Sequence, residues 1–313
     1  HGVGLYGMYQ YYLQTGDETI RDIIDSWFAD RFAEGATTKN VNTMAPFLTL
    51  AYRYEETRNP AYLPWLDSWA EWAMHEMPRT EFGGMQHITL AEENHQQMWD
   101  DTLMMTVLPL AKIGKLLNRP DYIEEATYQF LLHVQNLMDK DTGLWFHGWS
   151  YEGNHNFANA RWARGNSWLT IVIPDFLELL DLPENNAVHR YLVQVLNAQI
   201  AALAKCQNES GLWHTLLDDP QSYLEASATA GFAYGILKAV RKRYVGQEYT
   251  LVAEKAIRGI VQHISPEGEL LHTSFGTGMG HNLDFYRNIP RTSMPYGQAM
   301  AMLCLTEYLR KYF

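Results

Sequence analysis

The stretch NRPDYIEEATYQFLLHVQNLMDKDTGLWFH (118–147) contains the two kinds of helix-boundary segment that recur along this chain. It opens with a tight turn around a proline, continues with apolar residues at helical spacing over 126–138, and ends in a loop where histidine follows glycine. Proline at a helix start and glycine after a helix end are common boundary signals. The stretch therefore predicts one amphipathic helix between a short turn and a longer loop.

Both the tight turn and the loop with Gly and then His recur along the chain. Further tight turns with Pro or Gly occur at 15–19, 58–63, 181–186 and 245–250. Further loops with Gly and then His occur at 83–87, 211–214 and 268–272. The turns repeat every 45 to 65 residues or so, which is the length of a helical hairpin plus a long loop. Periods of this size indicate a repeat architecture.

The two kinds of boundary segment divide the expected helices into two sets. Helices that follow the longer loops or their equivalents are expected near residues 2, 42, 101, 164, 226 and 296, and they are rich in Gly, Ala, Met and Trp. Helices that follow the short turns are expected near 17, 61, 121, 185 and 248, and they carry more charge. Helices that are apolar all round are buried, and amphipathic ones lie outside.

This division predicts an all-α fold, an (α/α)6 barrel in which six inner helices are ringed by outer ones. Five outer helices are counted, so the first outer helix is expected to be missing before residue 1, where the chain starts at His1 inside an apparent helix. No linker or change of composition divides the sequence. We therefore expect a single domain over residues 1–313.

Charge and composition exclude several classes of partner. The 313 residues contain 24 Lys and Arg against 36 Asp and Glu, a net charge of −12. Nucleic acids and anionic membranes favour a basic face, so neither is expected as a partner. No apolar run approaches the length of a membrane span, and no signal peptide is visible. We expect a cytoplasmic monomer or homodimer, with the periplasm as the alternative.

Cysteine and histidine patterns give no sign of a disulfide framework or a metal centre. Cys206 and Cys304 each lie in an apolar segment, as expected of buried thiols. Neither an HxH nor an HExxH pattern occurs. The sequence predicts no metal and no cofactor.

The barrel predicts where polar residues meet. All inner helices would run the same way, so their N-termini would gather at one end. The residues at these starts are His1, Gly2, Asn40, Asn42, Trp99, Asp100, Asp101, Asn159, Arg161, Trp162, Arg164, Asn166, Tyr223, Glu225, Ser227, Arg291, Pro295 and Tyr296, and the loops add His87, His147, Trp149 and His214. Aromatic faces with carboxylates, amides and arginines are typical of carbohydrate sites.

Several of these residues also have a purely structural interpretation. Asp100 is suited to an N-cap, since Asp is favoured there and its charge suits the helix dipole. Arg161 and Arg164 could pair with a carboxylate under the barrel rim. The loop histidines could be packing elements, an interpretation favoured for His214 and His272.

Three motifs carry a resemblance to a known family: QMWDDTLMM (97–105), GLWFHGW (143–149) and RWARGNSW (161–168). With the expected barrel, the chain resembles glycoside hydrolase family 105, the unsaturated rhamnogalacturonyl hydrolases, over nearly its whole length. That family is related to the unsaturated glucuronyl hydrolases of family 88.

The resemblance implies an unusual hydrolysis. The substrate would be a lyase-generated oligosaccharide of rhamnogalacturonan or ulvan type, with a 4,5-unsaturated uronic acid linked to rhamnose at its non-reducing end. The enzyme would hydrate the C4=C5 enol ether and so release the uronate. Two rival functions are a non-catalytic sugar-binding homologue and a sugar epimerase on a similar barrel.

The resemblance also assigns roles to residues. Asp101 falls on the catalytic aspartate, which would act first as acid and then as base. Asn42 falls where many members carry a second aspartate, so Asp101 would work without it, with Asp100 as a possible helper. By the same resemblance, His87, Trp99, His147, Trp162, Arg164 and Trp168 would bind substrate. Asn42, Asp100 and Tyr296, which lie at inner-helix starts, are expected to bind it with them.

Overall fold

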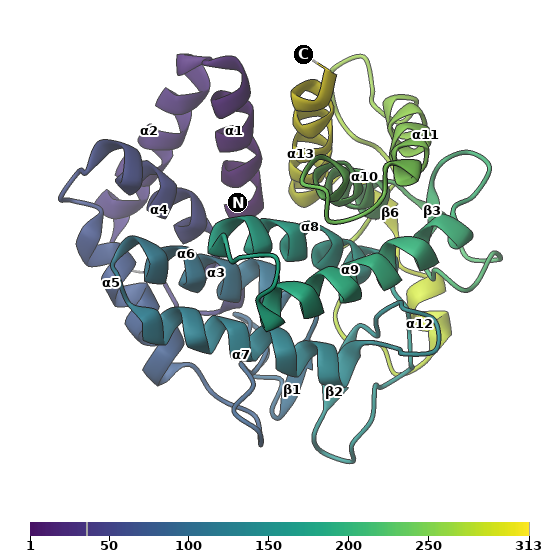
Figure 1. The fold of residues 1–313 in the computed structure, drawn as a ribbon, viewed down its shortest axis with the longest axis horizontal. Helices are drawn as coiled ribbons and strands as arrows, with labels where there is room; N and C mark the ends of the chain where they lie inside the picture. Colours follow the sequence, from purple (N-terminus) through teal and green to yellow (C-terminus); the bar gives the residue numbers. More distant parts are fainter. Residues whose placement is uncertain (36, 313) are drawn as a thin grey trace.

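The computed structural model describes residues 1–35 and 37–312. Over these residues six helices form an inner ring: α1 (Gly2–Thr15), α4 (Pro46–Thr57), α6 (Leu108–Leu116), α8 (Ala163–Leu180), α10 (Ala226–Arg241) and α13 (Pro295–Tyr312). Each helix packs against the next, and α13 packs against α1, so the first and last helices close the ring side by side (Figure 1).

Five outer helices cover the ring over the same residues: α2 (Glu18–Glu34), α5 (Leu63–Glu71), α7 (Pro120–Leu137), α9 (Ala187–Cys206) and α11 (Thr250–Val261). Each one packs against the inner helix that precedes it. The predicted all-α barrel is therefore confirmed, and the helices begin within a few residues of the predicted positions.

Shorter helical pieces complete the barrel. Helix α3 (Val41–Met44) leads into α4, and a π-helical segment (Leu103–Val107) leads into α6. A second π-helical segment (Trp72–Glu76) extends α5, and a 3₁₀ turn (Gln247–Tyr249) precedes α11. Helix α12 (Leu283–Arg287) lies in the loop before α13.

Glycines let the inner helices approach one another closely. A Cβ on Gly235 of α10 would lie 2.5 Å from the carbonyl carbon of Thr170 on α8, and one on Gly231 would lie 2.9 Å from the Cβ of Ser167. Contacts this short cannot be accommodated without a shift of the backbone. The small residues predicted for the inner set thus allow α8 and α10 to pack nearly backbone to backbone.

A buried polar network fills the barrel near the C-terminal ends of α8 and α10. The Lys238 ammonium lies 2.5 Å from a carboxylate oxygen of Asp175, which also accepts hydrogen bonds from Tyr6 and Tyr234. Burial opposes the charge of Lys238, but the facing Asp175 holds its pKa well above the ordinary value. Removing one member of such a pair leaves an uncompensated buried charge.

Short antiparallel strands join the loops that precede the inner helices. Strand β1 (Gln97–Trp99) pairs with β2 (Gly148–Ser150), so that Trp99 lies opposite Gly148. The other pairs are β3 (Trp213–His214) with β4 (Leu224–Glu225), and β5 (Thr273–Ser274) with β6 (Arg291–Thr292). Strands of two or three residues are too short to show the alternation by which a strand is recognised in a sequence.

Within residues 1–35 and 37–312, none of the helices combines the length and apolar character needed to cross a membrane. The two thiols are free: Cys304 is buried and Cys206 is half-buried.

Candidate active site

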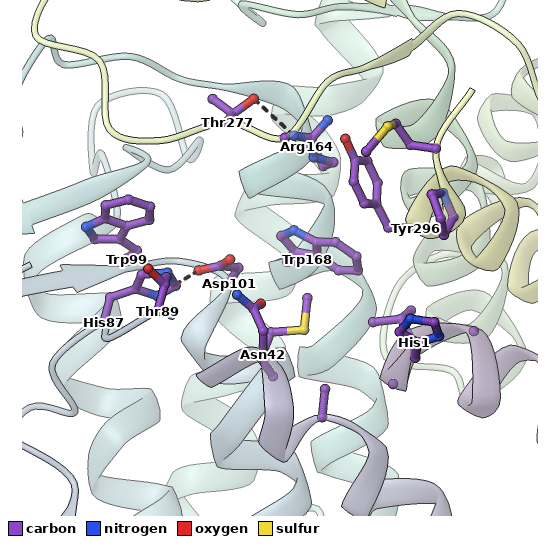
Figure 2. A pocket seen from close by; sticks show the side chains of 18 of the residues that line it. His1, Asn42, His87, Thr89, Trp99, Asp101, Arg164, Trp168, Thr277 and Tyr296 are labelled. Carbon is purple, nitrogen blue, oxygen red and sulfur yellow. Dashed lines mark hydrogen bonds and ion pairs between the residues drawn. The ribbon is translucent and has the colours of Figure 1, made fainter. Parts of the chain in front are cut away.

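A cavity of about 780 Å³ opens at the N-terminal ends of the inner helices. It is lined by eight of the residues that the sequence predicted for a site: Asn42, His87, Trp99, Asp101, Trp162, Arg164, Trp168 and Tyr296. Figure 2 labels all of them except Trp162. They come from the second, third, fourth and sixth inner-helix starts and the loops before them. The barrel therefore brings together side chains up to 254 positions apart, from 42 to 296.

Asp101 faces the cavity beside a histidine. Its side chain is 21% exposed, and one carboxylate oxygen lies 3.2 Å from Nδ1 of His87. The same nitrogen lies 2.8 Å from the hydroxyl of Thr102. Burial lowers the pKa of His87 even though Asp101 opposes that shift. A neutral imidazole next to Asp101 can orient its carboxyl group without forming a permanent ion pair.

The indole of Trp99 fixes the His87 ring. The two rings are stacked, with centroids 4.2 Å apart and planes 6° from parallel. Trp99 is the last residue of β1, which the pairing with β2 holds in place. The strand pair therefore positions the aromatic wall and delivers the chain directly into Asp100 and Asp101.

Asp100 lies behind the cavity wall, although it was predicted to bind substrate. Its side chain is fully buried, and neither carboxyl oxygen has a hydrogen-bond partner among the described residues. It therefore caps no backbone N–H, and the N-cap interpretation is wrong. Burial and then the charge of Asp101 raise the pKa of Asp100 well above its ordinary value. Of the two carboxyl groups, only that of Asp101 lines the cavity.

His147 also lies behind the wall. Its ring packs on Trp162, with centroids 4.4 Å apart, and on the edge of Trp99 at 5.3 Å. Its Nδ1 lies 2.8 Å from the hydroxyl of Tyr286. Burial lowers its pKa well below the ordinary value. His147 therefore supports two indoles that line the cavity and does not line it itself.

Arg164 holds a loop over the cavity. One terminal nitrogen donates to the carbonyl and hydroxyl of Ser274, and the other donates to the Phe275 carbonyl and the Thr277 hydroxyl. Figure 2 shows the bond to Thr277. The guanidinium lies between two aromatic rings, 4.4 Å from that of Trp162 and 4.6 Å from that of Tyr296.

All acceptors of the Arg164 guanidinium are neutral, and among residues 1–35 and 37–312 it forms no ion pair with a carboxylate. This contradicts the alternative in which it pairs with a carboxylate under the rim. One wall of the cavity therefore carries a positive charge that no salt bridge engages, which favours an anionic group of a ligand.

The three sequence motifs interlock behind the cavity. The carboxyl group of Asp100 occupies the space that a side chain on Gly165 would need, since a Cβ there would lie 2.8 Å from its Cγ. The amide of Asn166 accepts from the Trp145 N–H and donates to the carbonyls of Trp145 and Trp162. Motif residues that do not touch the cavity thus hold those that do.

Comparison with known proteins agrees with this architecture. The sequence matches the profile of Glycosyl Hydrolase Family 88 over residues 1–312. The chain belongs to this family. A curated relative, the unsaturated rhamnogalacturonyl hydrolase YesR of Bacillus subtilis, is 31% identical over 312 residues, which is 99% of this chain and 88% of the relative. An unsaturated 3S-rhamnoglycuronyl hydrolase of Alteromonas sp. is 25% identical over 216 residues, 67% of this chain and 51% of that protein.

Solved structures of this family have the same fold. A possible member of family GH105 from Salmonella enterica serovar Paratyphi A is 90% identical, with a TM-score of 0.99 over 100% of this chain and 83% of that one. A family 105 glycoside hydrolase from C. acetobutylicum is 24% identical, with a TM-score of 0.86 over 98% and 92% of the two chains. The resemblance to family 105 and its relation to family 88 are confirmed.

Several residues predicted for the rim have structural roles in this family 88 chain. Arg161 pairs with Asp139 and Asp218, each at 2.6 Å. Glu225 accepts hydrogen bonds from backbone N–H groups at the start of α10, and Asn40 does the same at the start of α3. His214 contacts the carbonyl of Ser222 through Nδ1. For Arg161 and His214 the structural interpretation fits these contacts.

Other lining residues escaped the sequence prediction. The α1–α2 hairpin contributes an apolar wall, the loop before β1 contributes Thr89, Glu92 and Asn94, and a glycine-rich loop contributes Gly276–Gly278. The wall residues outside the rim set are Val3, Gly4, Leu5, Met8, Ile23 and Trp27. The glycine-rich loop could have been predicted from the segment GTGMG (276–280), because glycine clusters often indicate a close approach of the backbone to a ligand.

A metal site is not formed by the described part of the chain. Among residues 1–35 and 37–312 there is no group of three or more His, Cys, Asp or Glu side chains placed to hold an ion.

Proposed function

We propose that this chain removes the 4,5-unsaturated uronic acid from the non-reducing end of lyase-generated oligosaccharides in which the uronate is linked to rhamnose. The names of its full-length relative and of the Alteromonas protein support an unsaturated uronyl substrate. The observation that carries the proposal is the position of Asp101, whose side chain lines the cavity beside His87, with Arg164 lining the same cavity.

Asp101 is proposed to perform both proton transfers. Its carboxylic acid protonates C4 of the enol ether, and water adds to C5, losing its proton to the carboxylate that has just formed. The resulting hemiketal opens at the ring oxygen, and the sugar on C1 is released. Asn42 lines the same cavity and points toward Asp101 in Figure 2, so its amide can orient the water but cannot act as a base.

The remaining lining residues are proposed to hold the sugar. The ring of the unsaturated uronate lies between the indoles of Trp99 and Trp168, since sugar faces pack well on aromatic rings. Arg164 attracts the carboxylate by its charge, because its terminal N–H groups already hold the loop. Trp162 and Tyr296 keep the guanidinium in place.

Further parts of the proposal concern the protein as a whole. Residues 1–313 act as a single catalytic domain without a cofactor. The partner is the unsaturated oligosaccharide, and the protein works in the cytoplasm as a monomer or homodimer.

The test is loss of the ultraviolet absorbance of the conjugated double bond when the protein is mixed with an unsaturated uronyl–rhamnose disaccharide. Asp101→Asn should lower kcat by about 10²- to 10⁴-fold, the usual contribution of a general acid–base group. Its circular dichroism and thermal midpoint should match those of the unaltered protein. If Asp101→Asn keeps most of the rate, Asp101 is not the acid.

A further inference from the structure

The glycine-rich loop that lines the cavity has little packing of its own. At its start, Arg164 donates hydrogen bonds to backbone carbonyls and hydroxyls within 274–277. Beyond that point a Cβ on Gly276 or Gly278 would meet no atom of the described chain within 4 Å. The position of 276–278 in the cavity wall therefore depends on what holds the far end of the loop.

The far end of the loop is held by a tyrosine. Tyr286, in helix α12, is fully buried and lies outside the lining of the cavity. Its hydroxyl accepts a hydrogen bond from the backbone N–H of Gly280 at 3.1 Å and lies 3.6 Å from Sδ of Met279. A Cβ on Gly280 would lie 2.6 Å from Cε2 of Tyr286. The glycine thus lets the backbone come close enough to the ring for its N–H to reach the hydroxyl.

The same hydroxyl contacts the histidine that supports the aromatic wall. It lies 2.8 Å from Nδ1 of His147, which is 139 positions away in the sequence, and the two rings meet edge to face with centroids 5.7 Å apart. His147 in turn packs on Trp99 and Trp162, and both indoles line the cavity. One hydroxyl of Tyr286 therefore joins the loop to the wall that carries the two indoles.

Elementary hydrogen-bond chemistry places the protons in this chain of contacts. The N–H of Gly280 can only donate, so the tyrosine oxygen accepts there and still has its own proton to donate. Burial lowers the pKa of His147 well below its ordinary value, so the ring is neutral and one of its nitrogens accepts. An imidazole nitrogen at 2.8 Å is a stronger acceptor than the thioether of Met279 at 3.6 Å. The hydroxyl therefore donates to Nδ1, and the proton of His147 lies on Nε2.

We propose that Tyr286 is a positioning residue for the hydrolysis: its hydroxyl ties the loop at Gly280 to the Nε2–H tautomer of His147, and so fixes two walls of the cavity relative to each other. Tyr286 acts through the loop and through His147, since its own side chain does not line the cavity. For the effect on catalysis this inference rests on the proposed function. The hydrogen bonds and the tautomer do not depend on it.

The first test is the nitrogen NMR spectrum of the histidine rings at neutral pH, with His147 assigned by a His147→Gln variant. In a neutral imidazole the protonated and unprotonated nitrogens have well-separated chemical shifts, so the spectrum shows which nitrogen carries the proton. We expect the Nε2–H tautomer in the unaltered protein and a shifted Nδ1 signal in Tyr286→Phe, where the hydrogen bond is lost. The Nδ1–H tautomer in the unaltered protein, or an Nδ1 signal that Tyr286→Phe leaves in place, would overturn the inference.

The second test is the absorbance assay on an unsaturated uronyl–rhamnose disaccharide. Tyr286→Phe keeps the ring and removes only the hydroxyl. It should raise KM by about two- to tenfold, the value of one ordinary hydrogen bond, with a smaller change in kcat, because the two walls bind the sugar. Gly280→Ala disturbs the same bond from the loop side, since its Cβ would press on the ring of Tyr286, and it should raise KM at least as much. An unchanged KM in both variants would overturn the inference while the proposed function stands.

Tyr122→Phe is the matched control. Tyr122 is also fully buried, and its hydroxyl donates to a carboxylate oxygen of Glu71 in the outer layer of the barrel. Its loss should lower the thermal midpoint at least as much as Tyr286→Phe does, because the bond is to a charged group, and should leave KM unchanged. If Tyr122→Phe raises KM equally, the effect is a general loss of stability and the inference is wrong. If the unaltered protein does not consume the disaccharide, the proposed function fails, and the nitrogen spectrum by itself supports or overturns the inference.

Discussion

Gly165→Ala tests whether the carboxyl group of Asp100 truly occupies the space beside α8. A Cβ at this position would lie 2.8 Å from Cγ and 3.0 Å from Oδ1 of Asp100, whose side chain is fully buried. Because the other side of Asp100 is packed, the carboxyl group would have to move, and the backbone that carries Asp101 would move with it.

Two opposing contributions set the expected change in stability. Alanine in place of glycine inside a helix contributes about 1 kcal/mol of stability. Overpacking a filled interior costs about 1–3 kcal/mol. The free energy of unfolding should therefore fall by about 0–2 kcal/mol. The value of kcat should fall by about tenfold or more, since small misplacements of a catalytic group are costly.

The assay combines urea unfolding with the absorbance assay on an unsaturated disaccharide. Gly4→Ala in α1 is the stability control, because a Cβ there meets nothing within 4 Å. It should be as stable as the unaltered protein or more so by up to about 1 kcal/mol. The reasoning is refuted if Gly165→Ala gains as much stability as Gly4→Ala and keeps full kcat.

Three further outcomes follow from the same geometry. Asp100→Asn should keep kcat within about tenfold, because the raised pKa of Asp100 already favours its uncharged form; a loss as large as that of Asp101→Asn would contradict this. Arg164→Lys should raise KM by about tenfold with a smaller change in kcat, because a single ammonium cannot replace the guanidinium that holds the loop 274–277. An unchanged KM would count against that role of Arg164. Burial lowers the pKa of His87 and His147, and it lowers the pKa of His133 to about 4. Below pH ~6.5 the unfolded chain takes up these protons more readily than the folded chain, so the free energy of unfolding should fall as the pH falls, by at most about 1.4 kcal/mol per pH unit for each histidine. The raised pKa of Asp100 acts in the opposite direction, because the folded chain then holds a proton that the unfolded chain has lost. Urea midpoints that do not fall between pH 7 and pH 5.5 would contradict the decrease expected from the three histidines.

Much of the barrel could be predicted because its signals are local. Helical spacing of apolar residues and the turn chemistry around Pro and Gly act over a few positions, and they place the helix starts within a few residues. The alternation of two helix types then implies a ring with all inner N-termini at one end. Asn42, Asp101 and Arg164 could therefore be assigned to one site although they lie far apart in the sequence.

The strand pairs and the π-helical segment before α6 could not be predicted in the same way. Strand β1 is defined by its pairing with β2, about fifty positions away, and not by a pattern of its own. The loops that carry Thr89 and Thr277 into the cavity likewise depend on contacts with distant elements.

Asp100 and Asp101 show most clearly what the sequence implies and what only the tertiary structure decides. Their sequence alone implies two acidic residues at the start of an inner helix and, through resemblance, a catalytic aspartate. Only the packing of three distant motifs places the Asp101 carboxylate in the cavity and the Asp100 carboxyl group against Gly165 behind it. Residue identity and local spacing encode the helices and their order, whereas the direction of each side chain depends on which neighbours leave room for it.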